Sequence, residues 1–174
     1  ESKRLCECYC KSYAVEFGVP VKIARLAQTF GAGVSLDDNR VFMQFTKNAL
    51  ERRNIILHTK GDSMSNFCYI TDAVRAILIL LSQGEVGEAY NVCHDEETRS
   101  IASIANLVAC HVGEDKISVI FDIPENLSSF GYAPTVHMFL NSKKMRSLSW
   151  EPQVSMKEAY MRLAEYIKEE RHHE

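Results

Sequence analysis

The chain has 174 residues, of which 46% are hydrophobic, and its formal net charge is −3. This length and hydrophobic content suffice for one sizeable core, and no shift in composition divides the chain, so we expect a single unit over residues 1–174. The slightly acidic balance excludes the broad basic field that drives nucleic-acid binding, and no apolar run is long enough to cross a bilayer. We expect neither nucleic acid nor a membrane as a partner.

The helix and strand signals begin at the first residues. Leu5, Tyr9, Tyr13 and Phe17 recur every four residues, which predicts a helix over residues 2–17 that ends at Gly18. The β-branched run 21–27 that follows predicts a short strand buried in a sheet. A helix that leads through a short turn into such a strand is half of an α/β unit.

The same alternation continues along the chain. The residue patterns predict helices at 41–53, 72–82 and 100–112, a short helix from Asn141 and a last helix after Ser155. They predict strands at 55–58, 67–70, 87–92 and 117–121, and a long loop at 124–134. The 72–82 helix is apolar all round, so we expect it to be buried on several sides. Ser155 and Glu158 have the spacing of a capping box.

The six cysteines do not have the spacing of a metal site. Three of them, Cys6, Cys8 and Cys10, are clustered, but zinc sites usually combine two short cysteine or histidine spacings and no second pair follows. We therefore expect no metal. Scattered cysteines in apolar surroundings are typical small core residues of a reduced protein, which predicts a cytoplasmic location.

Five short segments occur in the order and spacing of one known family. They are Glu1 to Lys3 with Glu7, and residues 18–33, 67–72, 141–144 and 148–152. They are similar to that family's YxxSKxxxE, GxPxxxxRxxNxYGPG, RDFIYVxD, D-x-S-K and LGWxP patterns. The chain thus resembles the C-terminal portion of the extended short-chain dehydrogenase/reductases of the NAD-dependent epimerase/dehydratase group, which act on nucleotide sugars.

This resemblance implies an α/β fold: the C-terminal part of a Rossmann-like parallel sheet together with the smaller α/β substrate-binding region. It also implies that the N-terminal dinucleotide-binding half is missing, because the chain starts inside the catalytic motif and contains no GxxGxxG turn. The parent protein would be an NAD- or NADP-dependent isomerase or lyase, and the fragment alone would be inactive. A non-enzymatic binding or regulatory module that keeps the fold is the alternative.

The resemblance assigns Lys3 a catalytic and cofactor-binding role. In the family, a tyrosine four residues upstream exchanges a proton with the sugar while the cofactor exchanges hydride. A phenol with a pKa near about 10 is a poor base at neutral pH, so a nearby ammonium must favour the phenolate. Lys3 would supply that charge and would hydrogen-bond the nicotinamide ribose. Without the resemblance, a solvated surface lysine is the simpler interpretation.

Five further residues match positions that line the family's ligands. Gln28 takes the place of an asparagine that contacts substrate, and Thr29 and Phe30 fall beside the nicotinamide. A strand-to-loop turn shaped by glycines explains the same residues without a ligand. Leu57 and His58 align with the edge strand at the nucleotide base, where a ring can stack, although a histidine at a strand end is often merely half exposed.

The chain also departs from the family pattern. The arginine that usually grips the nucleotide diphosphate would fall at Ser65, and a second one in the region 131–134, where neither is present. Losing this clamp weakens the case for an ordinary UDP-sugar ligand, and Lys60, Arg75 and Lys143 are the candidates to replace it.

Three other residues are interpreted as structural. We expect Asp72 to cap the first turn of a buried helix, and Trp150 and Pro152 to form a packing corner. If the strand at 21–27 belongs inside a parallel sheet, its exposed edge or the helix at 2–17 would promote self-association, so we expect a homo-oligomer.

Overall fold

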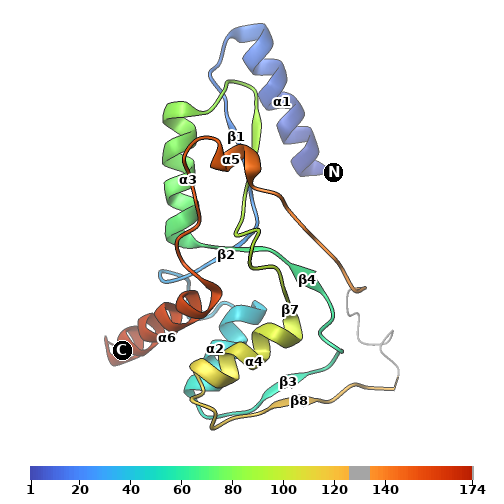
Figure 1. Ribbon diagram of the computed structural model, residues 1–174, viewed down its shortest axis with the longest axis vertical. Helices are drawn as coiled ribbons and strands as arrows, with labels where there is room; N and C mark the ends of the chain where they lie inside the picture. The colour runs from blue at the N-terminus through green and yellow to red at the C-terminus, as the bar shows by residue number, and fades with distance from the viewer. Residues whose placement is uncertain (126–133, 174) are drawn as a thin grey trace.

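The computed structural model describes residues 1–125 and 134–173. Figure 1 shows an elongated molecule with the N-terminal helix at its upper end and the C-terminal helix toward its lower end. The elements are α1 (Ser2–Phe17), β1 (Ile23–Leu26), β2 (Gln28–Phe30), α2 (Val41–Leu50), β3 (Ile55–Leu57), β4 (Met64–Ser65), β5 (Phe67–Tyr69), α3 (Ile70–Gln83), β6 (Ala89–Val92), β7 (Arg99–Ser100), α4 (Ile101–His111), β8 (Val119–Phe121), α5 (Lys143–Arg146) and α6 (Met156–His173).

Three of the four strand pairs are parallel, as expected for an α/β fold. β1 pairs with β6, β2 with β5 and β3 with β8, whereas β4 and β7 are antiparallel. The first two pairs continue into one another, because the Ala27 N–H donates to Val92 O and the His94 N–H donates to Phe67 O. The helix α3 connects β5 to β6, so the centre of the molecule is a βαβ unit.

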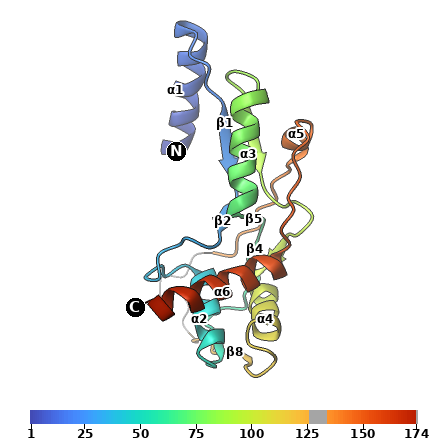
Figure 2. The ribbon, with the colours of Figure 1, turned by 90° about the vertical axis from the view of Figure 1, so that its left-hand side faces the viewer.

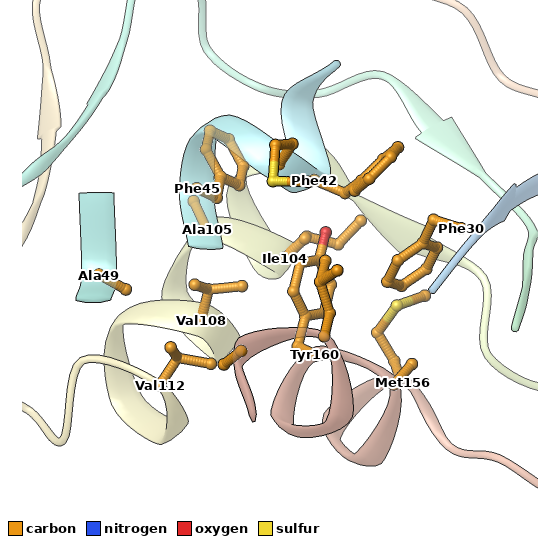
Figure 3. Packing of buried hydrophobic residues seen from close by; sticks show 14 of the residues in the cluster. Phe30, Phe42, Phe45, Ala49, Ile104, Ala105, Val108, Val112, Met156 and Tyr160 are labelled. Atoms are coloured by element: carbon orange, nitrogen blue, oxygen red, sulfur yellow. The ribbon is translucent and has the colours of Figure 1, made fainter. Parts of the chain in front are cut away.

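The buried side chains form two clusters. The larger one joins α2, α4 and α6 to β2, β3 and β5, and Figure 3 shows part of it around Phe42, Ile104 and Tyr160. The smaller one lies between α3, β6 and α5 and includes Tyr90 and Trp150. Trp150 has no exposed surface, so the predicted packing corner is confirmed for this residue.

Helix α1 has the bounds predicted from the sequence, and it ends at Gly18, whose φ of 65° is the left-handed conformation that favours glycine. All of its residues are described, and none is buried. Its strongest link to the sheet is the Arg25 guanidinium, which donates to both carboxylate oxygens of Glu7 at 2.7 and 2.5 Å. Figure 2 shows β1 lying between α1 and α3.

The prediction that the 72–82 helix is buried on several sides was wrong. In α3, the buried residues Asp72, Ala73, Ala76 and Leu80 form a single face, while Leu78 and Leu81 are exposed. The buried face packs against β5, β1 and β2. No other described element covers the opposite face, so a continuous apolar run did not translate into burial all round.

Asp72 is structural, but not as the predicted cap. Its side chain is 2% exposed, and its Oδ2 accepts the backbone N–H groups of Gln153 and Val154, each at 3.0 Å. Its Oδ1 accepts from Arg75 at 2.9 Å. The carboxylate therefore ties α3 to the segment before α6. At α6 itself, Ser155 accepts the Glu158 N–H at 3.3 Å, which is one half of the predicted capping box.

The prediction for the cysteines was correct in part. Cys68 and Cys93 are buried, whereas Cys6, Cys8 and Cys110 are exposed and Cys10 is half-buried; all six are free thiols. The cluster on α1 is exposed because that helix buries none of its surface. Across residues 1–125 and 134–173, no helix is long and apolar enough to span a membrane.

Candidate functional site

A cavity of about 350 Å³ opens between β2, the start of α2, and α6. This volume lies at the lower end of the range for small-molecule sites, about 300 to 1,000 Å³. Most of its lining residues are apolar or aromatic, and a few are polar. The described residues that line it are Gln28, Thr29, Phe30, Asn39, Arg40, Val41, Phe42, Phe67, Ile101, Ile104 and Tyr160.

Three of the residues predicted from the sequence lie together at this cavity. Gln28, Thr29 and Phe30 form β2, in parallel register with Phe67 to Tyr69. Gln28 is exposed and Thr29 half-buried, so both side chains are accessible from the solvent. The Thr29 hydroxyl donates to Ala27 O at 3.0 Å, which leaves its lone pairs free to accept.

Phe30 forms the floor of the cavity rather than an exposed contact. Its ring is 4% exposed and lies 5.1 Å from the ring of Phe42 and 5.0 Å from that of Tyr160, measured between centroids. It also meets Phe67 and Tyr69 edge-on. These contacts fix the position of β2 relative to α2 and α6, and thereby the position of Gln28 and Thr29.

Among the described residues that line the cavity, Arg40 alone has a charged side chain. Its guanidinium lies 4.7 Å from the centre of the Phe42 ring and donates to both oxygens of Asp38. This hydrogen-bonded pair raises the pKa of Arg40 and lowers the pKa of Asp38. The arginine is thus held at the cavity in a fixed orientation, with part of its charge already balanced.

Tyr160 enters the cavity from α6. Its side chain is 1% exposed, and burial raises the pKa of its phenol, so the hydroxyl stays protonated at neutral pH. No hydrogen bond joins this hydroxyl to any other residue in the described part of the chain. Figure 3 shows it pointing from α6 toward Ile104 and Phe42, two other residues of the lining.

The two residues predicted to line the nucleotide base lie elsewhere. Leu57 ends β3 and is 6% exposed in the larger core, and His58 follows it on the surface. His58 Nδ1 lies 3.0 Å from Asp122 O and 3.6 Å from Asp122 Oδ2. Neither residue lines the cavity. Their predicted role in base binding stays a prediction.

Lys3 lies in the first turn of α1 and is exposed. It is not among the described residues that line the cavity, so the structure does not bring it together with Gln28 to Phe30. Its catalytic role also stays a prediction. Among the described residues, the side-chain hydrogen bonds between α1 and the parallel strands join Arg25 to Glu7, which lies one turn after Lys3 on the same helix.

The candidates to replace the missing phosphate arginine differ in their surroundings. Arg75 is paired with the buried Asp72, while Lys60 and Lys143 are exposed and lie outside the cavity lining. Arg99 was not predicted, yet it lies directly across the β4–β7 ladder from Ser65. Residues 131–133, where the second arginine was expected, lie outside the described residues.

Arg99 has an unusual environment. Its Nε is buried without a hydrogen-bond partner in the described structure, and the nearest carboxylate oxygen, Glu97 Oε2, is 3.7 Å away. That oxygen already accepts the Met156 N–H at 2.8 Å. Directly opposed residues of an antiparallel pair project from the same face, so Arg99 extends on the side from which Ser65 projects.

Sequence analysis missed most of the cavity lining. Only Asn39 and Arg40 could have been suspected from the sequence, because they are polar residues just before an amphipathic helix. Tyr160 gave none, because it lies on the apolar stripe of a helix and meets the cavity through tertiary packing. Within the described residues, no group of three metal-ligating side chains is placed to hold an ion.

Comparison with known proteins identifies the family. Residues 1–93 match the model of the NAD dependent epimerase/dehydratase family. The chain belongs to this family. UDP-glucuronic acid decarboxylase 1 of Xenopus tropicalis is 27% identical over 175 residues, which cover 100% of this chain and 39% of the decarboxylase.

Solved structures of epimerase/dehydratase type show the same fold. UDP-glucose 4-epimerase of Thermotoga maritima with UDP-glucose has a TM-score of 0.79 at 23% identity, covering 94% of this chain and 51% of its own. The dTDP-glucose 4,6-dehydratase of Bacillus anthracis in complex with NAD has a TM-score of 0.76 at 18% identity, covering 95% and 50%. These similarities confirm the predicted α/β fold.

This epimerase/dehydratase chain spans about half or less of the length of these relatives. That coverage is consistent with the prediction that it corresponds to the C-terminal portion of such proteins.

Proposed function

We propose that this chain forms the substrate side of an NAD- or NADP-dependent enzyme that acts on a nucleotide-activated sugar, as an epimerase, dehydratase or related activity. The observation that carries the proposal is the convergence of Gln28, Thr29, Asn39 and Arg40 on one cavity in a member of this family. An amide that both donates and accepts suits sugar hydroxyls, and a guanidinium suits phosphate.

The residues present fit one end of a dinucleotide. Thr29 and Gln28 offer polar groups beside the cavity, where a nicotinamide carboxamide finds an acceptor and a donor. The eight glycines nowhere form a GxxGxxG turn, so this chain does not supply the pyrophosphate cradle. When bound, the cofactor supplies a reversible hydride acceptor.

Lys3 would assist the proton transfer between the acid/base tyrosine and the sugar rather than the hydride transfer to the cofactor. As an ammonium beside the phenol of the acid/base tyrosine, it would lower that phenol's pKa and hold the cofactor ribose. Lys3 is exposed and forms no ion pair with any described residue, which leaves its ammonium available for this role. The Glu7–Arg25 tie would hold α1 against β1 while it does so.

The diphosphate would be bound by arginines other than the family's usual pair. Arg40 stands at the cavity, and Arg99 stands opposite Ser65, where the usual arginine is missing. Both guanidinium groups are planar and can bind phosphate through two hydrogen bonds at once.

The proposal is tested by ligand binding and turnover in the full-length protein. We expect UDP-sugars or dTDP-sugars to bind, and Gln28→Ala to weaken that binding, whereas Gln83→Ala, at an exposed residue outside the cavity lining, should not. Conversion of a nucleotide sugar with transient reduction of the cofactor would support the enzyme. Failure of every nucleotide sugar and of the cofactor to bind would overturn the proposal.

A binding module without turnover is the second candidate function. The serine in place of a phosphate arginine at Ser65 favours it, because a weaker diphosphate clamp supports catalysis poorly. Binding of a nucleotide sugar without any cofactor reduction would select this alternative.

A further inference from the structure

The Tyr160 hydroxyl belongs to the cavity lining and has no hydrogen-bond partner among the described residues. The hydroxyl of a buried tyrosine usually has a hydrogen-bond partner, because a buried hydroxyl without a hydrogen bond costs free energy. Tyr166, six residues further along α6, does so by donating to Val34 O at 3.3 Å. Tyr160 is more deeply buried and no described residue hydrogen-bonds to it, but its hydroxyl oxygen is not one of the fully buried atoms without a partner, so it is accessible from the cavity that Tyr160 lines.

The surroundings of that hydroxyl are shaped for a flat ring. Phe30, Phe42 and Phe67 line the same cavity, and apolar atoms make up most of its wall. Aromatic walls favour a planar ligand that stacks or meets them edge-on. The volume of about 350 Å³ accommodates one ring system with its attached sugar rather than a complete nucleotide sugar.

From this geometry we infer that Tyr160 donates a hydrogen bond to a carbonyl-type acceptor on a planar heterocycle bound in the cavity, and thereby helps to select the ligand. The inference rests on the proposed function, which supplies two sources of this chemistry. One is the pyrimidine of a UDP or dTDP compound, and the other is the nicotinamide carboxamide. The protonated phenol can donate to either.

The test compares Tyr160→Phe with Tyr166→Phe in the full-length protein, by calorimetric titration with uridine, UDP and NAD⁺. Tyr160→Phe should weaken either the two uridine-containing ligands or NAD⁺ by about threefold to thirtyfold, which is the effect of one hydrogen bond. Tyr166→Phe should leave both affinities unchanged. If Tyr160→Phe loses affinity for uridine and UDP, the pyrimidine is the ring that binds in the cavity. If it loses affinity for NAD⁺, the nicotinamide is the ring that binds there.

Thermal unfolding of the ligand-free variants gives an independent readout. Tyr160→Phe should leave the melting temperature nearly unchanged, because the Tyr160 hydroxyl makes no hydrogen bond to the described protein, whereas Tyr166→Phe should lower it by removing the hydrogen bond to Val34 O. Equal loss for all ligands, or no loss for any, would overturn the inference while the proposed function stands. A wild-type protein that binds none of the three ligands would overturn both.

Discussion

The Asp72 carboxylate accepts the Val154 N–H at 3.0 Å, across 82 residues of sequence. The same oxygen accepts the Gln153 N–H, and the Asp72 carbonyl accepts the indole N–H of Trp150 at 3.0 Å. One residue of α3 therefore fixes the segment that leads into α6. Because α6 carries Tyr160, this connection also sets one wall of the cavity.

Replacement of Asp72 should destabilise the fold. Asp72→Ala leaves two buried or half-buried N–H groups and Arg75 without their acceptor, so we expect the free energy of unfolding to fall by about 2 to 4 kcal/mol. Urea unfolding of the variant measures it. Asp37→Ala, at an exposed aspartate, should change the free energy of unfolding by less than about 0.5 kcal/mol. Similar values for both variants would contradict the structural role of Asp72.

Thiol reactivity should divide the cysteines by their location. Burial raises the pKa of Cys68 to about 12 and that of Cys93 to about 11, so both stay protonated and shielded in the folded chain. At mildly alkaline pH, an alkylating reagent should label Cys6 and Cys8 rapidly, and Cys68 and Cys93 only on unfolding. Mass spectrometry of timed digests locates the label.

The same two shifts predict how stability depends on pH. The pKa of each buried thiol is raised on folding, so its contribution is complete below the unfolded value of about 8.5 to 9 and is lost as pH rises toward 11 to 12. The free energy of unfolding should therefore decline above about pH 9. A flat profile between pH 9 and 11 would contradict the burial of these thiols.

Self-association through α1 is a further prediction. Leu5, Tyr9 and Tyr13 lie on one stripe of this helix and are 54%, 58% and 53% exposed. Contact of this stripe with a second copy would remove it from water. We expect a dimer or larger species in sedimentation experiments, dissociated by Tyr9→Glu but not by Lys11→Glu. A monomer at all concentrations would contradict this.

Arg99 should contribute to the binding of the diphosphate and not to the binding of the base. In the full-length protein, Arg99→Gln should weaken UDP binding by about tenfold to a hundredfold, because a charged hydrogen bond is lost, and leave uridine unaffected. Ser65→Arg in the Arg99→Gln background should restore UDP affinity from across the ladder. An unchanged ratio of UDP to uridine affinity would remove Arg99 from the site.

The sequence was most informative where periodicity reports on one local element. The stripe from Leu5 to Phe17, with Gly18 after it, gave the bounds of α1, and the β-branched run gave β1 to within two residues. Short strands such as β4 and β7 were missed because two-residue ladders are specified by their partner, not by their own composition.

The site was less accessible from sequence than the fold. Gln28 to Phe30 were found because they fall within a family pattern. Tyr160 and Arg99 were not, because the packing of α6 and the register of β4 against β7 bring them into place. The exposed outer face of α3 was missed for the same reason, since hydrophobic content does not specify which faces find a partner.

Lys3 gives the most direct test of the account. In the full-length protein, cofactor reduction by a nucleotide sugar should fall by about a hundredfold or more in Lys3→Met, because general acid/base catalysis loses its supporting charge. Lys11→Met, at an exposed lysine of the same helix, should retain activity. A Lys3→Met enzyme that reduces its cofactor as fast as the Lys11→Met control would contradict the proposed mechanism.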